Sequence, residues 1–139
     1  MIDARDLRIG NWVYDGERTQ FPMRVQTIGE DYVYLNFDDN EGDVFESTPE
    51  ELHGIPITKE ILIKSGFEYV TEFTYELRLP NQIAGHDIIG IIVDSGFVSI
   101  AHESKSLIMS RCTCSGVHFV HQLQNIFWNI TKQQLKVNL

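Results

Sequence analysis

The chain has 139 residues, 42% of them hydrophobic and 11% aromatic, and its formal net charge is −9. This composition is typical of one globular domain or of two very small ones and excludes a disordered protein, while the negative charge disfavours direct binding to DNA, whose phosphates would repel the chain. No apolar run approaches the ~20 residues of a membrane span, the first residues are not those of a secretory signal, and two cysteines give no disulfide framework, so we expect a cytoplasmic protein without membrane contact.

The first 56 residues read as short strands joined by tight turns. Glycine, aspartate and asparagine separate runs that are rich in β-branched and aromatic residues, which is the pattern of hairpins. A small, strongly bent sheet or SH3-like β unit is the expected result. The expected strands are 9–14, 23–28, 32–37 and 43–46.

Alternation along the third of these strands predicts which side chains face the core. Tyr32 and Tyr34 fall on the opposite face from the apolar residues of the strand. Together with Trp12 they form a candidate recognition surface, or they simply flank a small core. The residues expected to face the core are Val33, Leu35 and Phe37.

Two short helical segments are expected in the middle of the chain. Thr48 precedes Pro49 and two glutamates, which predicts a single capped turn over 48–51. Thr58 is expected to cap a helix of about two turns, and Gly66 to end it in a left-handed conformation.

The second half of the chain predicts an antiparallel sheet and one long helix. A hairpin turn is expected at 94–96, where Gly96 supplies the position that needs a positive φ. We therefore expect an α+β fold in which a small N-terminal SH3-like β unit (1–56) precedes a helix, sheet and helix unit (57–139), the two forming one continuous globule. The sheet is expected to have three to four strands, covered by the long C-terminal helix. The expected elements are strands 73–79, 87–93, 97–101 and 107–112, a helix over 117–130 and an edge strand over 134–137.

The sequence CTCSGVHFVHQLQ (112–124) holds the most chemical residues of the chain. Cys112 and Cys114 are two positions apart and His118 and His121 are three positions apart, so a zinc- or thiol-dependent enzyme is one interpretation. Structural zinc sites, however, use wider spacings, commonly C-x₂₋₄-C with H-x₃₋₅-H. The favoured interpretation is therefore two small cysteines in a sheet strand and a His121 at the rim of the helix, hydrogen-bonded to a nearby carbonyl, with no metal and no cofactor.

Several stretches resemble a family of small proteins. They are IPITKEILIKSGFEY (55–69), VHFVHQLQNIFWNITKQQLKV (117–137) and RIGNWV near the start. In this order they resemble uncharacterised proteins of Bacteroidales bacteria, their mobile elements and their phages. The resemblance implies a phage or mobile-element accessory protein in a bacterial host cell and implies no mechanism. His121, Gln124 and Asn125 lie in its VHQLQN motif and, with Trp128, are the first candidates for a binding site, although packing is the favoured reason for them.

Three functions stay open on the sequence alone. The first is a non-enzymatic binding or accessory protein, with a protein partner or a second copy of the chain as its target. The second is a phage counter-defence factor that occludes a host protein with the acidic segment 30–51, which holds no Lys or Arg, or that sequesters a small nucleotide. The third is the zinc- or thiol-dependent enzyme described above.

Overall fold

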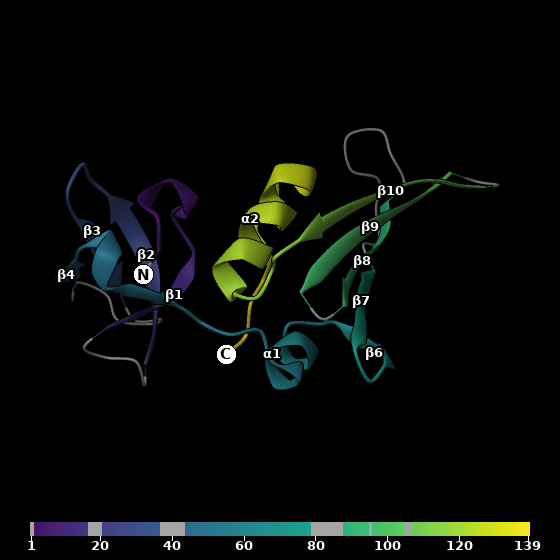
Figure 1. The fold of residues 1–139 in the computed structure, drawn as a ribbon, viewed down its shortest axis with the longest axis horizontal. Helices are drawn as coiled ribbons and strands as arrows, with labels where there is room; N and C mark the ends of the chain where they lie inside the picture. Colours follow the sequence, from purple (N-terminus) through teal and green to yellow (C-terminus); the bar gives the residue numbers. More distant parts are fainter. Residues whose placement is uncertain (1, 17–20, 37–43, 79–87, 95, 105–106) are drawn as a thin grey trace. The chain divides into compact units, whose positions relative to one another are not determined.

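The structure, a computed structural model, describes residues 2–16, 21–36, 44–78, 88–94, 96–104 and 107–139. It is an α+β fold with two antiparallel five-stranded sheets, which confirms the predicted class (Figure 1). The chain forms two compact units: unit 1 is Met1–Pro56 with Phe119–Gln134, and unit 2 is Ile57–His118 with Leu135–Leu139. In the described part of the chain, no helix is both long enough and apolar enough to span a membrane.

Unit 1 is a meander of short strands to which the last helix is added. Its sheet has the order β4-β3-β2-β1-β5, so that the fifth strand returns to pair with the first (Figure 1). A single 3₁₀ turn, η2, connects β4 to β5. The elements are η1 (Ala4–Asp6), β1 (Trp12–Asp15), β2 (Pro22–Ile28), β3 (Val33–Asn36), β4 (Phe45–Ser47), η2 (Pro49–Glu51), β5 (Leu52–Gly54) and α2 (Val120–Thr131).

Strand alternation builds the core of unit 1. Val33 and Leu35 are fully buried and Tyr32 is exposed, which confirms the face predicted for the third strand. Phe37 lies outside the described residues. The 3₁₀ turn η2 begins at Pro49 as expected, but the Thr48 side chain makes no capping hydrogen bond, so that part of the prediction is wrong. The buried cluster comprises Ile2, Leu7, Val13, Met23, Val25, Val33, Leu35 and Leu52.

Unit 2 is a five-stranded antiparallel sheet in sequential order, with one short helix (Figure 1). Three to four strands were predicted; the additional strand is β6, which pairs with β7 through a two-residue turn at Glu72 and Phe73. The hairpin expected at Gly96 is confirmed, with that glycine at φ +89° between β8 and β9. The elements are α1 (Lys59–Lys64), β6 (Glu68–Thr71), β7 (Thr74–Arg78), β8 (Ile88–Asp94), β9 (Phe97–Ser104) and β10 (Leu107–Ser115).

Helix α1 follows its sequence signals closely. The Oγ1 of Thr58 accepts a hydrogen bond from the backbone N–H of Ile61 at 3.3 Å, and Gly66 adopts φ +97° just after the helix. Only Leu62 of the helix is buried, and this single anchor packs the helix onto unit 2. The predicted cap and stop are therefore both confirmed.

The long helix α2 begins three residues later than the pattern predicts. Phe119 is its N-cap in extended conformation, and the Gln122 side chain accepts the backbone N–H of Phe119 at 3.1 Å. Residues 117 and 118 stay extended because the Val117 N–H donates to Gly96 and the His118 carbonyl accepts from Ile57, hydrogen bonds that a helix would not allow. The expected placement of His118 one helical turn before His121 is thus wrong.

The end of the chain also differs from expectation. Residues 134–137 form no strand, so the predicted edge strand is wrong. Leu135 is buried and Asn138 is hydrogen-bonded to the Lys64 carbonyl and the Ser65 hydroxyl, which ties the tail to the end of α1 by side-chain contacts instead of a ladder.

The division of the chain differs from the predicted one in a single respect. The two compact units are not the continuous segments 1–56 and 57–139, because α2 belongs to unit 1 with the first 56 residues. Polar side chains of α2, among them Gln124 and Asn125, have hydrogen-bond partners in the N-terminal segment.

Candidate functional site

Unit 2 contains a half-open cavity of about 340 Å³. It lies where the start of α1 meets the β6–β7 turn and the β8–β9 turn, with the segment before α2 on its far wall. Four parts of the chain therefore contribute to one hollow, which is the usual construction of a ligand site. Its lining residues are Ile57, Thr58, Lys59, Leu62, Glu72, Phe73, Tyr75, Val93, Gly96, Val117 and His118.

The cavity has an apolar floor and a polar rim. Leu62, Tyr75, Val93 and Val117 are buried and supply the floor. The rim consists of exposed side chains, and among them Phe73 has 60% of its surface open to solvent. A ligand that enters would therefore meet hydrophobic surface below and charged or aromatic groups at the opening. The exposed rim residues are Thr58, Lys59, Glu72, Phe73 and His118.

An aromatic pair positions the ammonium of Lys59. Its Nζ lies 5.4 Å from the centroid of the Tyr69 ring, a cation–π arrangement. Tyr69 in turn packs edge-to-face on Tyr75, its cross-strand partner, with the ring centroids 5.9 Å apart. Tyr75 also forms part of the cavity floor, so this pair of rings links the Lys59 ammonium to the floor.

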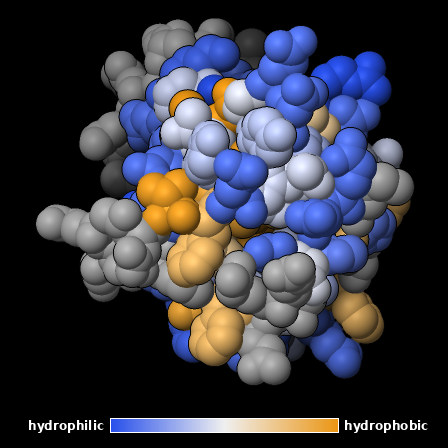
Figure 2. All heavy atoms as spheres, turned by 90° about the vertical axis from the view of Figure 1, so that its left-hand side faces the viewer, coloured by the Kyte–Doolittle hydropathy of each residue, from blue (hydrophilic) through white to orange (hydrophobic). Residues whose placement is uncertain are grey.

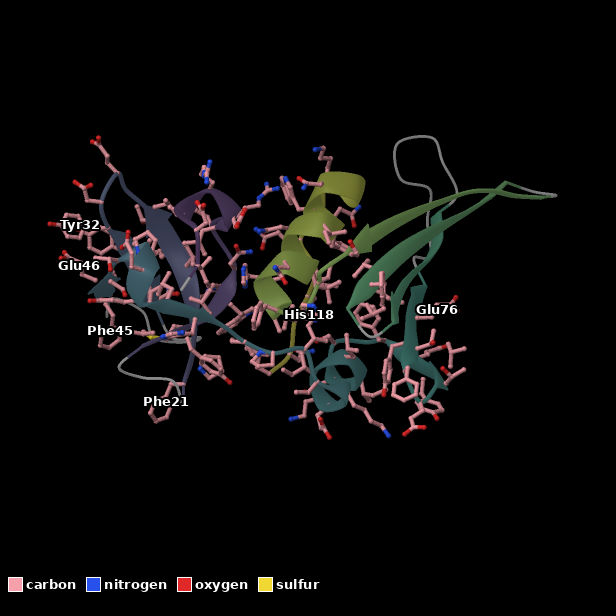
Figure 3. All side chains as sticks on the ribbon, in the orientation of Figure 1. Phe21, Tyr32, Phe45, Glu46, Glu76 and His118 are labelled. Carbon is pink, nitrogen blue, oxygen red and sulfur yellow. The ribbon has the colours of Figure 1, made fainter. Side chains whose placement is uncertain are left out.

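Backbone hydrogen bonds and a glycine fix the wall at His118. The His118 carbonyl accepts the Ile57 N–H at 3.0 Å, and the Val117 N–H donates to the Gly96 carbonyl at 2.9 Å. A Cβ on Gly96 would lie 2.6 Å from the Cε1 of His118, so the imidazole rests directly on this glycine. Figure 3 shows His118 on the side of unit 2 that carries α1.

Glu72 and Phe73 enter the rim from the β6–β7 turn. Both are exposed, since the two-residue turn projects them away from the sheet. Across the described residues, neither Lys59 nor Glu72 has an ion-pair partner. The rim thus presents one positive and one negative charge that remain available to a ligand.

The predicted binding residues of α2 belong to unit 1, and none of them lines this cavity. Gln124 is only 8% exposed, and its side-chain amide bridges two backbone groups of the N-terminal segment. Its Oε1 accepts the Trp12 N–H at 2.9 Å and its Nε2 donates to the Gly10 carbonyl at 3.1 Å. Both backbone groups are thereby satisfied, so the amide holds the entry to β1 against the helix.

Asn125 extends the same network by one residue. Its Oδ1 accepts from the Nδ2 of Asn11 at 2.9 Å, and its own Nδ2 donates to the Asp6 carbonyl. Asn11 is buried and its Oδ1 accepts the Arg8 N–H at 2.7 Å. The Arg8 guanidinium stacks over Trp128, 4.5 Å from the ring centroid. These contacts give the motif residues an architectural role in unit 1.

His121 is more deeply buried than the rim position expected of it. Only 3% of the residue is exposed, and its buried Nδ1 has no hydrogen-bond partner among the described residues, so this atom does not make the predicted hydrogen bond to a neighbouring carbonyl. Burial lowers the pKa of the imidazole, and the carboxylate of Asp6 opposes this shift to a smaller extent. The ring stacks on Phe119, with centroids 5.9 Å apart.

The three aromatic residues of the predicted recognition surface have separate surroundings. The Tyr34 hydroxyl donates to Glu46 Oε2 at 3.4 Å, across the β3–β4 pair. Trp12 pairs with Arg24 on β2, whose guanidinium lies 5.9 Å from the indole centroid. Tyr32 and Glu46 project from the sheet of unit 1 toward solvent (Figure 3).

The predicted metal ligands divide between the units. Cys112 and Cys114 lie on β10, where they pair with Ile100 and Val98, but their side chains fall outside the described part of the structure. His118 belongs to unit 2 and His121 to unit 1. Among the side chains that are described, no group of three or more His, Cys, Asp or Glu residues could hold a metal ion.

Comparison of the chain with family models, with curated proteins and with solved structures gives no match. The site is therefore interpreted from its own geometry.

Sequence reasoning did not identify the cavity of unit 2. It placed Thr58 and Gly96 correctly in a cap and a turn, but nothing in the spacing shows that these elements meet. The one available signal is Glu72-Phe73, a charged and an aromatic residue side by side at a hairpin tip.

Proposed function

We propose that the chain is a non-enzymatic binding protein whose ligand site is the cavity of unit 2. The observation that carries the proposal is that one cavity combines a buried apolar floor with an exposed rim. The rim includes Lys59, Glu72 and Phe73. A few convergent polar groups over an apolar floor are the usual features of small-molecule sites. Binding at such a site needs no reactive group, because burial of apolar surface drives it and the rim charges orient the ligand.

The test is a ligand-observed NMR screen of the full chain against a set of small acids, amines, amino acids and nucleosides. We expect hits that the wild type binds and that the Phe73→Ala variant binds at least severalfold more weakly. Phe73 is exposed, so its removal leaves the fold in place. The matched control is Phe21→Ala, which removes another exposed phenylalanine, this one from unit 1. A screen without hits, or hits that Phe21→Ala weakens as much as Phe73→Ala does, would refute the proposal.

Unit 1 is proposed to be an SH3-like module. The supporting observations are the strand order β4-β3-β2-β1-β5 and the single 3₁₀ turn that connects the last two strands. Together with the resemblance of the motifs to Bacteroidales mobile-element and phage proteins, this favours an accessory protein of a phage or mobile element as the biological setting.

Contact with a second copy of the chain is a further candidate, and the surface of unit 1 favours it. Figure 2 shows apolar side chains gathered among hydrophilic ones on the face that unit 1 presents there. Tyr32 and Val44 are exposed beside β3 and the outer strand β4. An outer strand can pair with its own copy about a two-fold axis. Sedimentation at rising concentration tests this: we expect a dimer that Val44→Lys dissociates, and a monomer at all concentrations would contradict it.

A further inference from the structure

We infer that the cavity of unit 2 binds a zwitterionic α-amino acid with a large apolar side chain, such as phenylalanine or leucine. The inference rests on the proposed binding function and names the ligand class of the same site. Size is the first reason. Ligand sites commonly span roughly 300–1,000 Å³. At about 340 Å³ this cavity is near the lower end, which fits a ligand of amino-acid size better than a dinucleotide or an extended cofactor.

The floor fits an apolar side chain. Leu62, Val93 and Val117 are aliphatic and buried, and the Tyr75 ring completes the surface. A phenyl or isobutyl group that enters would exchange water for these contacts, at roughly 25 cal/mol for each Å² removed from solvent. The exposed Phe73 at the opening would cover the ligand and lose solvent contact of its own.

The rim fits the two charges of an amino acid. The Lys59 ammonium, held at the Tyr69 ring, is positioned for a carboxylate, and the Glu72 carboxylate for an ammonium. Thr58 adds a donor, because its Oγ1 accepts the Ile61 N–H and its own hydroxyl proton can point to the ligand. Lys59, Thr58 and Glu72 thus supply one cation, one hydroxyl donor and one anion at the opening of a single cavity.

The same charges disfavour a nucleotide. Phosphate groups are usually held by several cations or by a run of backbone N–H groups. Here a single lysine would face the phosphates, with Glu72 in the same rim and a formal net charge of −9 on the chain. A zwitterion has no net charge and avoids this repulsion.

The test uses four probes and calorimetric titration of the full chain. They are L-phenylalanine, N-acetyl-L-phenylalanine, which lacks the ammonium, L-phenylalaninamide, which lacks the carboxylate, and adenosine. We expect the wild type to bind L-phenylalanine and to bind each blocked analogue about three- to fivefold more weakly, since ion pairs at an exposed rim contribute up to about 1 kcal/mol. Adenosine has neither an ammonium for Glu72 nor a carboxylate for Lys59, and it is expected not to bind.

Charge-removing variants assign each end of the ligand. Lys59→Met should bind L-phenylalanine and its amide equally, and Glu72→Gln should bind L-phenylalanine and its N-acetyl form equally. Lys64→Met and Glu60→Gln, which remove the same charges from exposed positions of α1 outside the cavity, should keep the wild-type ranking. Both rim positions are exposed, so the variants retain the fold.

The outcomes separate the two proposals. Equal binding of all three phenylalanine probes by the wild type, or a ranking unchanged in Lys59→Met and Glu72→Gln, would overturn the zwitterion inference. Binding of adenosine without binding of L-phenylalanine would also overturn it, while leaving a binding protein at this cavity in place. Failure of every probe together with an empty screen would remove the proposed function itself.

Discussion

Replacing Gln124 by alanine should destabilise unit 1 strongly, although it removes no apolar core residue. The side-chain amide satisfies two backbone groups at once, the Trp12 N–H through Oε1 and the Gly10 carbonyl through Nε2. The residue is only 8% exposed, so water does not readily take over these hydrogen bonds. Alanine would leave both groups of the N-terminal segment without partners.

The magnitude follows from the number of groups left unsatisfied. A buried donor or acceptor without a partner costs about 1–3 kcal/mol. Two such groups would together cost about 2–6 kcal/mol of the free energy of unfolding, and the upper part of this range applies if no water reaches them. We expect a loss of about 2–4 kcal/mol, because water can enter the space that the shorter side chain leaves. Gln124→Glu keeps the acceptor but not the donor, so its loss should include the Gly10 carbonyl and the cost of burying a carboxylate.

Urea unfolding followed by tryptophan fluorescence measures this effect in the right place. Both tryptophans, Trp12 and Trp128, belong to unit 1 and lie beside the network. Gln26→Ala, which removes the same side chain from an exposed position of β2, is the matched control and should change the free energy of unfolding by less than about 0.5 kcal/mol. A Gln124→Ala variant as stable as Gln26→Ala would refute the structural role assigned to the VHQLQN motif.

Three further expectations concern single positions. Gly96→Ala should destabilise unit 2 by about 1–3 kcal/mol more than Gly116→Ala in amide hydrogen exchange, because both have positive φ but only the first would also meet the His118 ring; equal losses would contradict this contact. Thr58→Ala should cost about 1 kcal/mol in the same measurement and Thr58→Ser much less, since serine keeps the capping oxygen; equal losses in the two variants would dispute the cap. Because burial lowers the pKa of His121 below its usual 6.5, the unfolded chain takes up the proton first, so unit 1 should lose stability as pH falls through and below 6.5, and His121→Gln should flatten this dependence; parallel curves for the two proteins would contradict the burial.

Local signals predicted the elements of this fold well. Period-two alternation identified the buried face at Val33 and Leu35, and the Thr58 cap and Gly66 stop fixed the short helix α1. These features depend on neighbours within a few residues, which a sequence displays directly. Strand β6 escaped notice because all its residues are exposed and it has no alternation to detect.

Long-range polar contacts could not be predicted in the same way. The apolar face of α2 is visible in the sequence, but its partner sheet is not. The contacts that join the helix to the first 56 residues include hydrogen bonds between the side-chain amides of Gln124 and Asn125 and backbone groups more than 110 positions earlier. Any sheet could in principle have accepted that apolar face, so periodicity could not choose between the two.

The candidate site depends on the same kind of information. Lys59, Glu72 and His118 belong to three separate segments of the chain, and they meet because α1, the β6–β7 turn and the segment before α2 converge. The helical pattern in the sequence also includes Val117 and His118. In the structure these two residues are extended, because Val117 donates a hydrogen bond to Gly96 and His118 accepts one from Ile57. A residue assigned to a helix face was therefore part of a cavity wall.

The most direct test of this account maps the ligand onto the two units by methyl NMR. L-Phenylalanine is added to the full chain and the shifts of two groups of methyls are followed: those of Leu62, Val93 and Val117 in the cavity of unit 2, and those of Val25, Leu35 and Leu123 in unit 1. We expect saturable shifts at the first group and none at the second. If the shifts centre on Leu123 and its neighbours in α2 and the cavity methyls do not change, the ligand binds at the VHQLQN motif of the helix. This result would contradict the site assigned to unit 2.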